Sequence, residues 1–132
     1  MKYSVDKKEQ YVIFTPHEEK LDSSLSPVLK SELLTVHAEG YKNLILDMSE
    51  VKYADSSGLS ALLVGNRTFN EDGGIFVIAA PQEHVFKLIK ISMLDKVLNV
   101  VDTHEEAAEA IFIHEIKNNS EEEEEGEEEE EL

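Results

Sequence analysis

The chain has 132 residues, a length typical of one domain, and its apolar fraction of 41% is enough for a hydrophobic core. The net charge is −17, but ten of the negative charges belong to two glutamate runs, 121–125 and 127–131, so the remainder carries −7. No cluster of Lys or Arg is present, which argues against direct binding of nucleic acid or of an anionic membrane surface.

The absence of cysteine excludes a disulfide framework, a thiolate metal site and a cysteine nucleophile. The N-terminal residues lack the apolar segment of a secretory signal. No apolar run approaches the roughly 20 residues that are needed to cross a bilayer. We therefore expect a cytoplasmic protein without a membrane-inserted segment.

The predicted elements alternate between strands and helices along the chain. The first half is expected to contain strands at 3–5 and 11–15, a helix that begins between Asp22 and Ser26 and ends by Gly40, and strands at 43–47 and 51–54. The second half is expected to contain a helix from Ser57 to Asn70, a strand at 75–80, a helix opened by Pro81, a short strand at 97–101, and a helix from Thr103 to about Lys117.

Individual residues support these assignments. Pro27 is tolerated only in the first turn of a helix, which limits where the first helix begins. The run Leu44–Leu46 is wholly apolar, as in a strand that is covered on both faces. Thr103 and Glu106 form a capping box. The apolar residues expected inside the second and third helices are Leu59, Leu62, Leu63 and Phe69, then Val85, Phe86, Leu88 and Ile89, whereas Asn66 and Arg67 are expected to lie away from the apolar stripe.

This order predicts an α/β domain with a mixed sheet of four to five strands and about four helices packed on it. The domain is expected to span residues 1–117. Residues 118–132 form a separate acidic tail, which we expect to be disordered because its like charges repel and it has almost no apolar side chain to bury.

The stretch Asp55-Ser56-Ser57-Gly58 lies where a strand is expected to turn into a helix. Either serine is a candidate cap for the first backbone N–H groups of that helix. The same N–H groups and the positive end of the helix dipole also favour a phosphate. Gly58 has no Cβ, so another part of the backbone or a partner can approach closely.

In this context, the stretch Asp55–Leu59 resembles the phosphorylation motif of STAS domains, and in particular that of bacterial anti-sigma-factor antagonists. The resemblance extends over residues 3 to about 113 and includes the segments Gly73–Val77, Val85–Leu88 and Met93–Leu98 in the order of the family. It implies that Ser56 is the phosphorylated residue. Asp55 is then expected to orient the Ser56 hydroxyl, and Ser57 to be the helix cap.

The resemblance also implies a function without catalysis, cofactor or metal. Unphosphorylated antagonists of the family bind a partner that is both an anti-sigma factor and a serine kinase, and so release the sigma factor; phosphorylation blocks binding and a serine phosphatase restores it. The switch and partner-binding residues implied here are Leu21, Asp22, Ser23, Asp55, Ser57, Gly58, Leu59 and Arg67.

Two other classes of function remain open at this point. A STAS domain can also serve as a constitutive interaction subunit of a lipid-transport ATPase or a sensory scaffold. An enzyme that hydrolyses a phosphate would rest on Asp47 and Asp55 as a paired magnesium site. The five histidines have no metal-ligand spacing with one another and are expected at the surface or half-buried.

Overall fold

The computed structural model describes the backbone of residues 1–131 and the side chains of residues 1–119. Its elements are β1 (Tyr3–Lys7), β2 (Val12–Pro16), β3 (Lys20–Leu21), α1 (Ser26–Ala38), β4 (Asn43–Asp47), β5 (Tyr53–Ala54), α2 (Ser56–Glu71), β6 (Ile75–Ala79), α3 (Glu83–Ile91), the 3-10 turn η1 (Leu94–Lys96), β7 (Asn99–Val101) and α4 (His104–Glu131). Most of the acidic tail that the sequence predicts to be disordered, residues 120–132, lies where the side chains are not described. The disorder of this tail stays a prediction.

The main sheet has five strands in the order β1-β2-β4-β6-β7. Strand β1 pairs with β2 as an antiparallel hairpin, and the remaining pairs are parallel. The mixed sheet and the four α-helices of the described residues confirm the predicted fold class. Strand β5, at the position of the strand expected at 51–54, does not join the main sheet but pairs with β3 in a separate two-stranded sheet.

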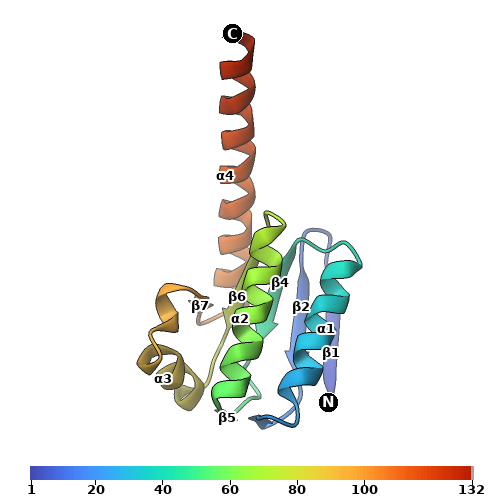
Figure 1. The fold of residues 1–132 in the computed structure, drawn as a ribbon, viewed down its shortest axis with the longest axis vertical. Helices are drawn as coiled ribbons and strands as arrows, with labels where there is room; N and C mark the ends of the chain where they lie inside the picture. The colour runs from blue at the N-terminus through green and yellow to red at the C-terminus, as the bar shows by residue number, and fades with distance from the viewer. Residues whose placement is uncertain (132) are drawn as a thin grey trace.

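Helices cover both faces of the sheet (Figure 1): α1 and α2 lie side by side on one face, and α4 lies on the other. Alternate residues of each strand therefore enter two separate cores. Leu44 and Leu46 of β4 pack under α1 and α2, whereas Ile45 packs with Ala107 and Ile111 of α4. All five residues of β4 are buried, as the apolar run predicted.

The start of β4 is tied to three other segments by one buried amide. Asn43 is only 2% exposed. Its Oδ1 accepts a hydrogen bond from the N–H of Ile75 at 3.1 Å, and its Nδ2 donates to the carbonyl of Gln10 at 3.0 Å and to Glu115 at 2.7 Å. A buried amide with every group paired fixes the register of neighbouring elements, because a shift would leave a buried polar group without a hydrogen-bond partner.

Helix α4 continues beyond the expected end near Lys117. The Nδ2 group of Asn118 donates to the carbonyl of Gly73 at 2.9 Å, and His114 contacts the same carbonyl at 2.9 Å. These contacts hold α4 against the loop before β6. One of the two bonds of the expected capping box is present at its start, where Thr103 Oγ1 accepts from the N–H of Glu106 at 3.1 Å.

Two side chains lie differently from the prediction. Asn66 was expected on the solvent side of α2, but it is only 5% exposed and its Oδ1 has no hydrogen-bond partner among the described residues. Phe86 was expected inside α3, but it is 37% exposed while Val85 and Ile89 fill the core. In both helices the apolar period was identified correctly, but the width of the buried face depends on the neighbouring elements.

Gly65 gives α2 its close approach to the sheet. A Cβ at this position would lie 2.7 Å from the ring of Phe76 and 3.1 Å from Leu33, both fully buried. We expect Gly65→Ala to lower the free energy of unfolding by about 1–2 kcal/mol, because overpacking outweighs the better helix propensity of alanine. Urea unfolding measures the change; Arg67→Ala, at an exposed position of α2, is the control and should stay within about 0.5 kcal/mol of wild type. A Gly65→Ala protein as stable as this control would contradict the packing argument.

Candidate functional site

The turn before α2 is closed by Asp55, which is the N-cap of the helix. Its backbone is extended, with φ −109° and ψ −171°. Its Oδ1 accepts hydrogen bonds from the N–H groups of Ser57 at 2.9 Å and Gly58 at 3.2 Å. The expected cap at Ser57 was therefore wrong: Asp55 accepts from these N–H groups, and Ser57 is the second residue of the helix.

The Asp55 carboxylate is held in its charged form. The hydroxyl of Ser57 is the main cause that lowers the pKa of Asp55, followed by the backbone N–H of Gly58, while partial desolvation and the nearby charge of Asp22 act in the opposite direction. The turn thus presents a permanent negative charge close to a second carboxylate at neutral pH.

Ser56 is the first residue of α2 and is exposed. Its hydroxyl has no hydrogen-bond partner within residues 1–119, and the expectation that Asp55 orients it is not met. The hydroxyl that Asp55 Oδ1 binds belongs to Ser57. Ser56 is therefore the accessible hydroxyl of this turn, whereas Ser57 is held inside the local hydrogen-bond network.

The loop at Leu21 lies directly against this turn, as expected. Strands β3 and β5 pair with Leu21 opposite Ala54, and the N–H of Asp55 donates to the carbonyl of Leu21 at 3.3 Å. A Cβ on Gly58 would lie 2.8 Å from the same carbonyl. Gly58 therefore allows the loop at Leu21 to approach the turn closely. The loop and the turn together form one surface.

Ser26 strengthens this junction, and the sequence analysis assigned it no role at the site. It is 1% exposed, and its hydroxyl lies 3.0 Å from that of Ser57 and donates to the carbonyl of Asp22 at 2.7 Å. These bonds connect the beginnings of α1 and α2. Nothing in the sequence around Ser26 distinguishes it from an ordinary first-turn serine.

A small hollow of about 140 Å³ opens beside the turn. Its lining residues are Lys20, Leu21, Asp22, Tyr53, Ala54 and Asp55. Tyr53 is 52% exposed, and its ring meets that of His84 edge-on at 5.1 Å. An exposed aromatic side chain next to a hollow is suited to contact with a protein partner, and Tyr53 is a site residue that the sequence analysis missed.

The other residues expected at the site differ in their exposure and in their distance from the turn. Leu21 and Leu59 are 1% and 7% exposed, so they position the surface mainly from inside the core. Ser23 is exposed on the loop, and Asp22 accepts from the N–H of Ser24 at 3.0 Å. Arg67 is exposed, but it lies about 16 Å along α2 from Ser56 and is not brought to the turn.

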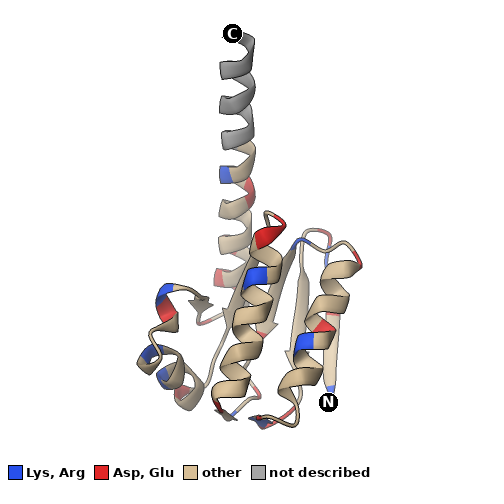
Figure 2. Cartoon of the chain, viewed as in Figure 1, with Lys and Arg blue, Asp and Glu red and all other residues tan. Residues whose placement is uncertain are grey.

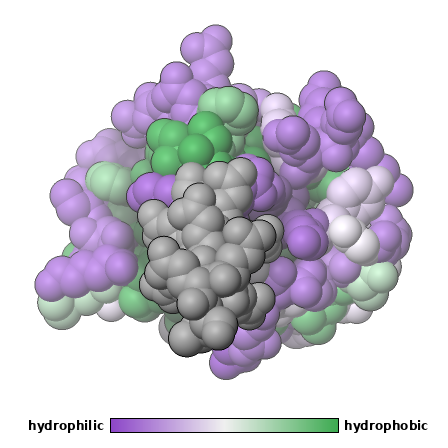
Figure 3. Space-filling view, turned by 90° about the horizontal axis from the view of Figure 1, so that it is seen from above, coloured by the Kyte–Doolittle hydropathy of each residue, from purple (hydrophilic) through white to green (hydrophobic). Residues whose placement is uncertain are grey.

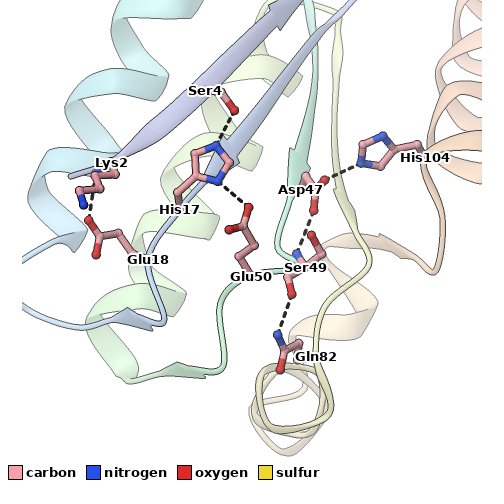
Figure 4. Close-up of polar contacts among 9 residues, drawn as sticks. All are labelled: Lys2, Ser4, His17, Glu18, Asp47, Ser49, Glu50, Gln82 and His104. Atoms are coloured by element: carbon pink, nitrogen blue, oxygen red, sulfur yellow. Dashed lines mark hydrogen bonds and ion pairs between the residues drawn. The ribbon is translucent and has the colours of Figure 1, made fainter.

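Asp47 belongs to a different network, on the far side of β4 (Figure 4). Its carboxylate bonds to His104 at 2.6 Å and accepts from the N–H of Ser49 at 2.9 Å, while Gln82 donates to the carbonyl of Ser49 at 2.6 Å. Asp47 and Asp55 thus each bind their own partners. Among the residues that the structure describes, no group of three or more potential ligands is arranged to hold a metal ion, and the paired magnesium site gains no support.

Asp47 makes stability depend on pH. Burial raises its pKa, but the hydrogen bonds from Ser49 and His104 outweigh burial and leave the pKa below the usual 3.8. Because the folded pKa is lowered, the ionised group stabilises the fold above pH 3.8, and this contribution is lost as the pH falls through the folded pKa. We expect Asp47→Asn to show a smaller loss of Tm than wild type between about pH 6 and pH 3. Differential scanning calorimetry tests this, with the exposed Asp95→Asn as control; identical pH profiles for Asp47→Asn and wild type would contradict it.

The fold and the turn define a class: a small α/β domain that presents a strand–helix junction with an accessible serine. The sequence model of the STAS domain matches residues 2–107, and the chain belongs to this family. The part of the chain that the structure describes includes no helix of the length and apolarity needed to cross a membrane.

Several known proteins are similar to this chain. A protein of Thermotoga neapolitana, described as an anti-sigma factor antagonist homolog, is 30% identical over 73 residues, which are 55% of this chain and 65% of that protein. A crystal structure of an anti-sigma factor antagonist from Thermotoga maritima has a TM-score of 0.76 at 24% identity, over 83% of this chain and 93% of the other. The phosphorylated form of the Bacillus protein SpoIIAA has a TM-score of 0.63 at 18% identity, over 83% and 99%. The two structural matches show the common fold, and the sequence match spans just under two thirds of the relative.

Proposed function

We propose that the chain is an anti-sigma-factor antagonist that is switched by phosphorylation of Ser56. In its unmodified form it binds an anti-sigma factor that is also a serine kinase, and this binding releases the sigma factor. A serine phosphatase returns the modified form to the binding state. The domain acts in the cytoplasm as a substrate and binding partner of these enzymes and performs no catalysis of its own.

The observation that carries this proposal is the accessible hydroxyl of Ser56 at the first position of α2. It is exposed and unpaired among the described residues, while the neighbouring Ser57 is bound to Asp55 and Ser26. A kinase can therefore reach Ser56 without breaking the junction. The similarity to proteins described as anti-sigma factor antagonists, one of which, SpoIIAA, has been solved in unphosphorylated and phosphorylated forms, supports the same assignment.

The local charges explain how the modification would act. A phosphate adds about −1.5 to −2 charges. The N–H groups of Ser57 and Gly58, which would stabilise an anion, already bind the Asp55 carboxylate. The phosphate would therefore add negative charge beside Asp55 and Asp22 with little compensation. A partner fitted to the neutral hydroxyl and to the hollow beside it would have to desolvate this unpaired charge and make room for the phosphate, so binding would be weakened.

Phosphorylation is tested by mass spectrometry of the protein isolated from its native cells, before and after treatment with a phosphatase. We expect one phosphate on Ser56, which is absent from Ser56→Ala and retained in Ser57→Ala. An unmodified Ser56 in every growth condition would overturn the switch. Co-purification of wild type with transporter subunits in place of a kinase would favour a constitutive subunit instead.

A further inference from the structure

A second surface lies on the opposite face of the sheet from the turn, along α4. An open groove of about 530 Å³ runs between the β1–β2 turn and this helix. Its lining residues are Gln10, Tyr11, Glu105, Ala108, Glu109 and Phe112. The space-filling view down on this end of the molecule shows apolar side chains exposed among hydrophilic ones (Figure 3).

The groove has an apolar floor with an acidic edge. Ala108, Phe112 and Ile116 follow one another at four-residue spacing, so they form one stripe along α4. Phe112 is 60% exposed and Ile116 is 49% exposed. Glu105 and Glu109 lie on the same side of the helix and form no ion pair within residues 1–119.

The two charged residues in the lining of the groove, Glu105 and Glu109, are both acidic. Lys and Arg are few and dispersed over the described residues (Figure 2), and the stripe itself contains none. Farther along the chain, the runs 121–125 and 127–131 add ten more glutamates. The family match ends at residue 107, so Phe112, Ile116 and the glutamate runs lie outside the part that the chain shares with the family model.

We propose that this groove, which we call the α4 groove, binds an amphipathic segment rich in lysine or arginine from a partner protein. Apolar side chains of the segment would cover Ala108 and Phe112. Its cations would pair with Glu105 and Glu109 and lie over the rings of Tyr11 and Phe112, where cation–π attraction adds to the ion pairs.

Charge decides between this occupant and a second copy of the chain. Two copies meeting through α4 would bring two surfaces with the same acidic residues, Glu105 and Glu109, together, and the net charge of −17 on each chain would add to the repulsion. The cations of a basic segment would instead form ion pairs with these carboxylates. Because α4 and the turn lie on opposite faces of the sheet, the groove is independent of the proposed switch (Figure 1).

The test uses the full chain and two labelled helical peptides of equal positive charge, one made of lysine and leucine and the other of lysine and serine. Fluorescence anisotropy at about 0.15 M salt, where the Debye length is about 8 Å, limits long-range attraction to the glutamate runs. We expect the lysine–leucine peptide to bind about tenfold more tightly, since the apolar floor adds contacts that serine cannot make.

Phe112→Ala is expected to remove this preference. The double variant Glu105→Gln and Glu109→Gln is expected to weaken the binding of both peptides. Both changes lie at exposed positions and leave the core intact. Phe86→Ala, which removes a partly exposed ring on α3, is the matched control and should bind as wild type does. The proposal that the α4 groove binds a basic segment would be overturned by any of three results. These are equal binding of the two peptides by wild type, no binding of either peptide, and an unchanged preference in Phe112→Ala.

Discussion

Replacing Ser56 with aspartate is expected to weaken binding of the proposed anti-sigma factor about a hundredfold, which corresponds to about 2.7 kcal/mol. The new carboxylate would stand at the first position of α2, beside the charged Asp55 and close to Asp22. Three carboxylates would then face a partner surface that is fitted to a hydroxyl. Burying the added carboxylate against a surface that offers it no counter-charge costs desolvation free energy of this order or more.

Isothermal titration calorimetry with the purified partner measures this change. Ser56→Ala adds no charge and should bind about as well as wild type, and it leaves the turn intact because the hydroxyl has no partner within the described part of the chain. Asn70→Asp adds the same charge at the other end of α2, about 20 Å away and beyond the Debye length, and should leave affinity almost unchanged. Wild-type affinity in Ser56→Asp would remove the electrostatic basis of the switch.

The thermal stability of Ser56→Asp separates a loss of binding from a loss of fold. An acidic side chain in the first turn of a helix interacts favourably with the helix dipole, although Asp55 opposes it here. We therefore expect a Tm close to that of wild type. A large drop in Tm together with weaker binding would instead indicate that the turn itself had been disturbed.

Gly74→Ala is expected to cause the largest loss of stability of the changes considered, about 3 kcal/mol or roughly 10 °C in Tm. A Cβ at this position would lie 1.7 Å from the carbonyl oxygen of Lys42 and 2.6 Å from its carbon. Both atoms are backbone, so no flexible side chain can move aside. The start of β6 would have to separate from the loop that leads into β4.

Gly73→Ala is the matched comparison one residue earlier. Gly73 has φ +80°, and its Cβ would meet no atom within 4 Å. Its cost comes from backbone conformation alone, about 1–2 kcal/mol for an L-residue in the left-handed region. Chemical unfolding of both variants therefore compares lack of space with conformational strain. If Gly74→Ala were as stable as Gly73→Ala, the close approach of the two segments would not be a constraint on the fold.

Much of the fold could be predicted from periodicity alone. The wholly apolar run in β4 required cover on both faces, and the structure places helices on both. Pro27 limited the start of α1, which indeed begins at Ser26. The pairing of β3 with β5 was not predictable in this way, since two-residue strands have no measurable period.

The candidate site was predicted in location but not in its internal bonding. The spacing Asp55-Ser56-Ser57-Gly58 indicated a capped helix start with a hydroxyl, yet all three polar side chains are capable caps. The extended backbone at Asp55 directs its carboxylate to the N–H groups of Ser57 and Gly58, and this geometry decides which residue caps. Tyr53 and Ser26 join the site only because segments distant in sequence meet there.

The sequence by itself determined that this protein is one α/β domain with a strand–helix turn as its distinctive feature, because those properties depend on local pattern and composition. Only the tertiary structure decided that Ser57 is bonded to Ser26 of α1, that Gly58 serves the approach of Leu21, and that Phe112 of α4 is left uncovered. These outcomes depend on contacts between segments dozens of residues apart. A local sequence pattern does not specify such contacts, because each segment taken alone could pack against several different neighbours.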